Sequence, residues 1–192
     1  MQGEVVFDIE TYGDIRNRAE LKVTVVSVYE YDTDTYTSFD EHQLADLWPI
    51  LERATRIIGY NSKGFDAPIL DKFYTGDINV IPHLDLLEKI RESAGKRFKL
   101  DDVAKATLEI SKSADGLAAI KWYEEGKIDE IKKYCEQDVR VTKEVYEFGK
   151  KNKMLYTSNL TGDLMPIPVD FSDFPVDEQG SVGSGVNMTL PL

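Results

Sequence analysis

The sequence predicts an α/β fold with a mixed central sheet flanked by helices. Short apolar and β-branched runs mark strands at residues 4–9, 22–32, 35–39, 56–60 and 78–82. Amphipathic stretches mark a helix after the third strand and another after the fourth, and the chain from about residue 84 reads as mostly helical. Three consecutive strands followed by alternating helices and strands fit a single α/β domain.

Each element has its own signal. The run EVVFDI at 4–9 reads as a core strand, and 22–32 alternates with period two, which predicts one more solvated face. A helix over 41–53 should begin with Asp40 as its N-cap. Residues 56–60 end at Asn61, and the next helix should run over 65–73.

Helices are predicted over about 84–93, 100–107, 116–125 and 128–150. We therefore assign residues 1–151 to the α/β domain. Residues 152–171 predict a β-hairpin extension, in which Pro166 and Pro168 confine the second strand to an edge. Residues 172–192 are rich in Gly, Ser and Pro without periodicity, which predicts a mobile tail.

Composition narrows the class of protein. The 192 residues include a single cysteine, Cys135, which excludes an internal disulfide framework and favours a reducing, cytoplasmic setting. The sequence has no apolar run long enough to predict a membrane span, and the N-terminus lacks a signal-peptide pattern. The net charge of −12 argues against broad electrostatic binding of duplex DNA, but it allows contact with a few terminal nucleotides.

Acidic residues with regular spacing are the main candidates for chemistry. Asp8 and Glu10 lie two apart on a predicted strand and so share one face. Tyr134 and Asp138 lie four apart on a predicted helix and share a face there. Asp66 follows the strand that ends at Asn61. Clustered carboxylates repel one another unless a cation neutralises them, and oxygen donors suit Mg²⁺ or Mn²⁺.

Each acid also has a purely structural interpretation. Asp8 and Glu10 could be solvated acids at a strand end, but burying two like charges in a core strand is costly without a cation. Asp66 could simply interact with a helix dipole. Asp138 could be an exposed helix acid in a chain that has 35 acidic residues.

In their order, these motifs resemble those of a known enzyme family. FDIET, then Asn61 to Asp66 as NxxxFD, then Tyr134 to Asp138 as YxxxD, are similar to the motifs of the DEDD superfamily of 3′–5′ exonucleases. The tyrosine points to the DEDDy branch, which includes the proofreading domains of family B DNA polymerases. Lys133 stands where the histidine branch has its histidine. The resemblance spans about residues 4–150 and implies a ribonuclease H-like fold, with an antiparallel three-strand meander followed by parallel strands.

The resemblance also implies roles. Asp8, Glu10 and Asp138 would bind the catalytic ion, Asp8 would bridge to a second Mg²⁺ or Mn²⁺, and Asp66 would support that ion. Tyr134 would hold the attacking water, since a phenol is a poor general base. The expected substrate is the 3′ end of single-stranded DNA or RNA, released as nucleoside 5′-monophosphates.

Other residues are weaker candidates. Substrate contacts are expected from part of the three motifs and from the basic loop GKRFK, namely Thr11, Asn61, Lys63, Phe65, Lys96, Arg97 and Lys99. Asn61 could instead fix its loop, and the basic loop could simply be solvated. His42 and His83 read as surface or strand-end residues, and Asp85 reads as a helix cap.

Two other functions stay open at this point. The chain could be a nucleic-acid-binding or scaffolding module that keeps the fold without turnover, as its acidity would favour. It could also be a fragment of a family B polymerase, although no segment resembles a polymerase palm, so a stand-alone nuclease is expected. Neither the choice between DNA and RNA nor a protein partner, such as a polymerase or helicase, follows from the sequence.

Overall fold

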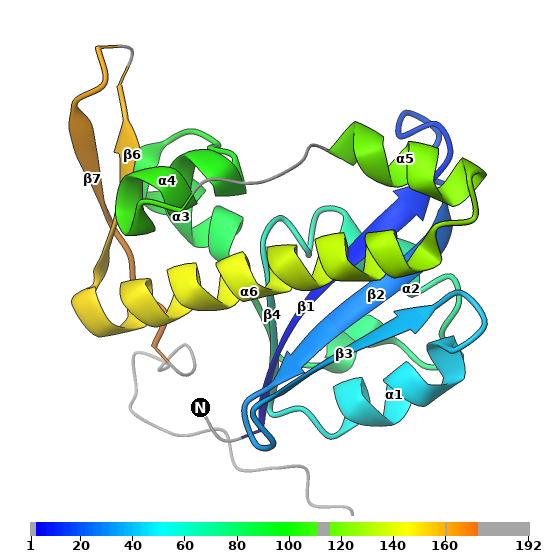
Figure 1. The fold of residues 1–192 in the computed structure, drawn as a ribbon. Coiled ribbons are helices and arrows are strands. Elements are labelled where there is room, and N and C mark those ends of the chain that lie inside the picture. Colours follow the sequence, from blue (N-terminus) through cyan, green and yellow to red (C-terminus); the bar gives the residue numbers. More distant parts are fainter. Residues whose placement is uncertain (1–2, 111–115, 160, 173–192) are drawn as a thin grey trace, which may run out of the picture.

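The computed structural model describes residues 3–110, 116–159 and 161–172. Its centre is a five-stranded sheet with the order β3-β2-β1-β4-β5 (Figure 1). β1 (Glu4–Tyr12), β2 (Lys22–Glu30) and β3 (Thr35–Asp40) form an antiparallel meander. β4 (Arg56–Gly59) and β5 (His83–Asp85) then join in parallel on the other side of β1. The predicted α/β class and mixed sheet are confirmed.

Helices cover both faces of this sheet. The elements besides the strands are α1 (Leu44–Glu52), α2 (Asp66–Leu70), the 3-10 turn η1 (Ile78–Val80), α3 (Leu86–Ala94), α4 (Leu100–Leu108), α5 (Gly116–Glu124) and α6 (Ile128–Asn152). One core cluster joins Val5, Phe7 and Ile9 of β1 to α1 and α2. The other joins Val6 to α3, α4 and α6, the long helix that crosses the meander in Figure 1. Asp8 and Glu10 therefore point to the α6 side.

The long helix α6 is amphipathic, and its buried stripe explains its position. Buried residues recur every three or four positions along it, including Ile131, Cys135, Asp138, Val145 and Tyr146. Asp138 thus lies inside a stripe that is otherwise mainly apolar. This placement contradicts the interpretation of Asp138 as an exposed helix acid.

The prediction of a wetter face on β2 is wrong. Nearly every residue of β2 is buried, because helices cover both faces of the sheet. The buried hydroxyls of β2 have partners inside: the hydroxyls of Ser27 and Ser38 lie 2.8 Å apart, and the Thr24 hydroxyl donates to the Glu10 carbonyl over 3.0 Å.

Two element boundaries also differ from the sequence prediction. α1 begins at Leu44, because the Asp40 carboxylate accepts from the amide of His42 in a turn and does not cap the helix. Residues 78–82 hold no strand: the Asp77 carboxylate caps a 3-10 turn by accepting from the Asn79 amide, and β5 begins at His83.

The hairpin after α6 consists of β6 (Met154–Ser158) and β7 (Leu164–Pro168), paired antiparallel. It projects past α4 (Figure 1), and Leu164 at its tip is 60% exposed. At its base Phe171 is fully buried against Tyr146, with 5.9 Å between the ring centroids. The predicted mobile tail lies outside the described residues, except for Ser172.

A buried polar network joins the two ends of the domain. Arg56 pairs with Glu4, and the Tyr146 hydroxyl lies 2.9 Å from both carboxylate oxygens of Glu4. Arg56 also donates to the carbonyl of Ser172 over 3.1 Å. β1, β4, α6 and the segment after β7 are thereby fixed to one another. In the described part of the chain, no helix is both long and apolar enough to cross a bilayer.

Candidate active site

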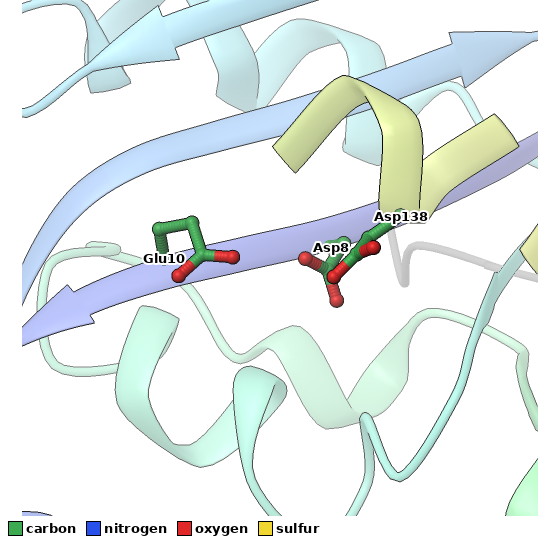
Figure 2. A group of neighbouring side chains, drawn as sticks. All are labelled: Asp8, Glu10 and Asp138. Carbon is green, nitrogen blue, oxygen red and sulfur yellow. The ribbon is translucent and has the colours of Figure 1, made fainter. Parts of the chain in front are cut away.

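Three carboxylates from distant parts of the chain converge beside β1. One carboxylate oxygen from each of Asp8, Glu10 and Asp138 lies within 4.8 Å of those of the other two (Figure 2). Asp8 and Glu10 are half-buried, whereas Asp138 is only 7% exposed. No other group of three His, Cys, Asp or Glu side chains among the described residues meets this condition. The packing of α6 against β1 thus brings these acids together in space.

Local backbone features position the two β1 acids. Alternation along the strand places Asp8 and Glu10 on the α6 face. The pairing with β2 shifts register between Glu10 and Thr11, so that Thr24 is left as an extra residue on β2. Such bulges bend a strand locally and are common beside functional sites. Thr11 itself lies just after this irregularity and is half-buried.

Asp66 lies beside the stretch of β1 that has no pairing with β4. β4 pairs with β1 only as far as Val6, so the amide of Ile9 is left to donate to the Asp66 carboxylate. Burial raises the pKa of Asp66 to about 7, and the charge of Asp85 adds to this, while the Ile9 amide opposes it. Asp66 therefore neighbours the three acids through Ile9 but is not one of the three that converge.

Tyr134 precedes Asp138 by one turn of α6 and is 8% exposed. Its ring meets the indole of Trp122 from α5 at 6.1 Å between centroids and an interplanar angle of 64°. A second aromatic pair involves the next residue of α5: the ring centroids of Tyr12 and Tyr123 are 4.8 Å apart. Sequence reasoning missed Trp122, because α5 carries no motif and its approach to α6 is a tertiary contact.

The single cysteine contacts one residue of the acid cluster, Asp8. The Cys135 thiol donates to the Asp8 carbonyl over 3.4 Å and approaches the Asp8 Oδ2 at 3.7 Å. Burial raises the pKa of the Cys135 thiol well above its usual value, and the charges of Asp8 and Glu10 add to this effect. The thiol therefore stays protonated and acts as a hydrogen-bond donor to Asp8.

Asp85 organises the loop that leads to Asp66. One of its carboxylate oxygens accepts from the amides of Asn61 and Leu87, and the other accepts from the amide of Lys63. Asp85 thus caps α3, as predicted, and also holds the 61–64 loop, which the sequence did not indicate. Asn61 adopts a left-handed conformation with φ +63°, so this carboxylate stabilises a backbone shape that non-glycine residues rarely adopt.

Only some of the weaker candidates come together. Asn61, Lys63 and Arg97 line one pocket, where the Asn61 side-chain oxygen accepts from Arg97 over 2.6 Å. Phe65 lies under the guanidinium of Arg18, 5.3 Å from its ring centroid. Two further basic residues stand apart from the pocket: Lys96 lies over the ring of Phe98, and Lys99 precedes α4.

The donor set suits a hard divalent cation. Three carboxylates supply only oxygen ligands, which Mg²⁺ and Mn²⁺ prefer over softer sites. A cation would offset both the mutual repulsion of Asp8, Glu10 and Asp138 and the cost of burying Asp138 and Asp66. The residues present therefore fit such an ion.

Comparison with known proteins agrees with this geometry. The sequence model of the RNase H superfamily matches residues 5–148, whereas no curated protein matches the chain significantly. Among solved structures, the family B DNA polymerase from the hyperthermophilic archaeon Pyrobaculum calidifontis is similar, with a TM-score of 0.62 and 20% identity over 76% of this chain. The match spans 24% of that polymerase, and at this identity it shows a shared fold.

Proposed function

This chain belongs to the RNase H superfamily, and from its acid cluster we propose that it is a metal-dependent 3′–5′ exonuclease of the DEDDy type. The observation that carries the proposal is the convergence of Asp8, Glu10 and Asp138 from β1 and α6 within 4.8 Å. Buried like charges of this kind need a cation, and hydrolysis of a phosphodiester uses one. The substrate class follows from the resemblance of the three motifs.

The three converging acids would hold the catalytic ion. Asp8 would also face a second ion, and Asp66, whose carboxylate accepts from the Ile9 amide, would support that ion. Two divalent ions, when bound, stabilise both the attacking and the leaving oxygen of the phosphodiester. Cys135 contacts the Asp8 carboxylate through its thiol, and Glu10 lies opposite the bulge at Thr24 of β2.

Tyr134 would position the attacking water. It sits on the same face of α6 as Asp138, and Trp122 packs against its ring and limits its movement. A phenol hydroxyl with a usual pKa of about 10 accepts and donates hydrogen bonds at neutral pH without giving up its proton. Its role is therefore to orient the water, and each turnover would release a nucleoside 5′-monophosphate.

Single strands are the proposed substrate, because the net charge of −12 disfavours a long duplex footprint. Few phosphates need to be bound at a chain end, and aromatic side chains can stack on exposed bases. Three half-buried rings could serve in this way: Phe65 and the pair formed by Tyr12 and Tyr123.

The decisive test is digestion of single-stranded DNA and RNA oligonucleotides carrying a label at either end, with Mg²⁺, Mn²⁺ or EDTA. A 3′–5′ exonuclease shortens 5′-labelled strands stepwise and releases the 3′ label as a mononucleotide at once. EDTA should abolish both. Cleavage of circular single strands would contradict the exonuclease assignment.

A matched pair of variants shows whether activity belongs to the acid cluster. Asp8→Asn removes one charge from the cluster, whereas Asp46→Asn removes one from the exposed side of α1. Activity should be lost in the first variant and kept in the second. Equal activity in both would refute the site. Metal binding without any cleavage by the wild-type protein would favour a binding module.

A further inference from the structure

A pocket of about 210 Å³ opens at the carboxyl ends of β4 and β5. Its walls come from the 61–64 loop, the start of α3 and the loop that follows α3. The polar side chains that line it are Asn61, Lys63, Asp85, Glu88, Arg91 and Arg97. Three of these are cationic, which is unusual in a chain with a net charge of −12.

The two acids of this pocket have partners of different kinds. Backbone amides donate to the Asp85 carboxylate, and Glu88 forms an ion pair with Lys63 at 2.7 Å. Within the described residues, neither Arg91 nor Arg97 forms an ion pair with a carboxylate, although the charge of Arg91 also acts on Glu88. With three cationic and two acidic side chains, the pocket keeps a net positive charge that can attract an anion.

Arg97 is held in place. Its guanidinium donates to the side-chain oxygen of Asn61 over 2.6 Å, and Asp85 fixes the backbone of Asn61 in turn. An arginine ordered in this way loses less conformational freedom on binding, and its planar fork matches two phosphate oxygens. Arg91 faces the same space from the next turn of α3 after Leu87.

The pocket and the acid cluster lie at a similar level along the parallel strands of the sheet. Val6 pairs with Ile58 and Gly59 pairs with Asp85, so the parallel register places Asp8 and Asp85 near the same level on β1 and β5. Two strand spacings separate β1 from β5, which amounts to roughly 10 Å. A nucleic-acid strand covers that distance in one to three nucleotides, since its phosphates rise by about 3.4 Å each in a duplex and by more when extended.

We propose that this pocket binds a backbone phosphate of the substrate strand, upstream of the nucleotide held at the acid cluster, through Arg91 and Arg97. The proposal rests on the proposed exonuclease function. It assigns an anion site to Arg91, which no motif indicated. It also explains how a strongly acidic protein holds a polyanion, since Arg97, held by Asn61, and a second arginine, Arg91, line this pocket.

Two substrates separate this pocket from the catalytic centre. Thymidine 5′-(4-nitrophenyl phosphate) has a scissile phosphate but no upstream nucleotide, whereas a single-stranded 12-mer has both. Arg91→Gln and Arg97→Gln, singly and together, should raise KM for the 12-mer by about tenfold or more, as expected for lost charge-assisted contacts. Cleavage of the nitrophenyl ester should stay at the wild-type level.

Salt dependence gives a second readout. Loss of one phosphate contact should make the slope of log KM for the 12-mer against log salt shallower by about 0.7. Arg53→Gln is the matched control, because Arg53 pairs with Glu30 at the opposite end of the strands, level with the start of β1. It removes the same charge and should change neither KM nor the slope.

Two results would overturn the proposal. One is a wild-type KM and salt slope on the 12-mer in the double variant. The other is an equal loss on both substrates, which would show that the arginines support the catalytic centre and not an upstream phosphate. If the wild-type protein cleaves neither substrate, the exonuclease function itself is wrong, and the proposed phosphate site falls with it.

Discussion

The indole of Trp122 meets the phenol ring of Tyr134 edge-on, with 6.1 Å between their centroids. This contact fixes the Tyr134 ring independently of its hydroxyl. Replacement of the hydroxyl alone should therefore leave the packing of α5 on α6 intact. Tyrosine and phenylalanine differ at this position only in the atom to which we assign a role.

Tyr134→Phe should therefore lower kcat by about tenfold or more, which is about 1.4 kcal/mol of activation free energy, and leave Mn²⁺ affinity nearly unchanged. Asp138→Asn should lose both activity and much of the affinity, because it removes a proposed ligand. Single-turnover kinetics and calorimetry measure the two effects. Full turnover in Tyr134→Phe, where chemistry limits the rate, would contradict the water-positioning role.

Metal binding should stabilise the fold. An ion at 100 times its Kd adds about 2.7 kcal/mol to the free energy of unfolding, so saturating Mn²⁺ should raise Tm. Asp8→Asn should largely abolish this rise, while the metal-free variant should be at least as stable as wild type because a like charge is removed. Thermal denaturation with and without Mn²⁺ tests both statements, and an unchanged rise in Asp8→Asn would place the ion elsewhere.

His83 should make the free energy of unfolding depend on pH. Its ring packs on Phe7 and lies 2.8 Å from the Ser62 hydroxyl, and burial lowers its pKa from 6.5 to about 4, with the charge of Lys63 adding to the effect and that of Glu88 opposing it. Because the folded-state pKa is the lower one, the unfolded chain binds more protons between these values. The contribution of neutral His83 is therefore present above about pH 6.5 and is lost as pH falls towards 4, up to roughly 3 kcal/mol.

Urea denaturation at pH 7 and at pH 4.5 measures this contribution. His83→Gln should be less stable than wild type at pH 7, and the gap should shrink at pH 4.5. The other histidine provides the control: the side chain of His42 is 88% exposed, so His42→Gln should cost little stability at pH 7. A constant difference between His83→Gln and wild type would show that His83 titrates normally.

The Cys135 thiol should be inert in the folded protein. It is fully buried, and its raised pKa keeps it protonated beside Asp8 and Glu10. At pH 8 we expect no reaction with 5,5′-dithiobis(2-nitrobenzoate) until denaturant is added, when one equivalent should react. Rapid labelling under native conditions would show that α6 opens readily.

The base of the hairpin should contribute far more to stability than its tip. Phe171 packs against Tyr146 and lies so close to Gly149 that an added Cβ there would come within 2.4 Å of its ring. Phe171→Ala should therefore cost about 3–5 kcal/mol of unfolding free energy. Leu164→Ala, at a position 60% exposed, should cost almost nothing. Equal effects in chemical denaturation would show that Phe171 is not docked in solution.

Periodicity predicted which acids share a face, and the resemblance of the three motifs predicted that Asp138 would join Asp8 and Glu10. A spacing of two on a strand and of four on a helix fixes which side chains share a face, and a core strand with two acids calls for a partner. What the sequence missed depends on contacts between elements. Trp122 reaches Tyr134, and Arg91 reaches the pocket, only through helix packing, which no local pattern encodes.

The errors in the fold have two origins. Alternation over residues 22–32 predicted a more solvated face on β2, but helices cover both faces of the sheet, and Ser27 and Thr24 find hydrogen-bond partners in the interior. Residues 78–82 have the apolar character of a strand, yet the Asp77 cap turns the chain into a 3-10 helix. Tertiary surroundings outweighed the local pattern in β2, whereas a local cap outweighed the apolar run at residues 78–82.

The contact between Glu4 and Tyr146 spans 142 positions of the chain. Its formation, like the meeting of Asp8 with Asp138, has to wait until α6 has left the ribosome. At usual rates of synthesis, β1 emerges on the order of ten seconds before its partner helix. During that interval the growing chain carries the first two acids without the third. The proposed nuclease activity, which needs all three acids, would therefore be absent until nearly the whole domain has been made.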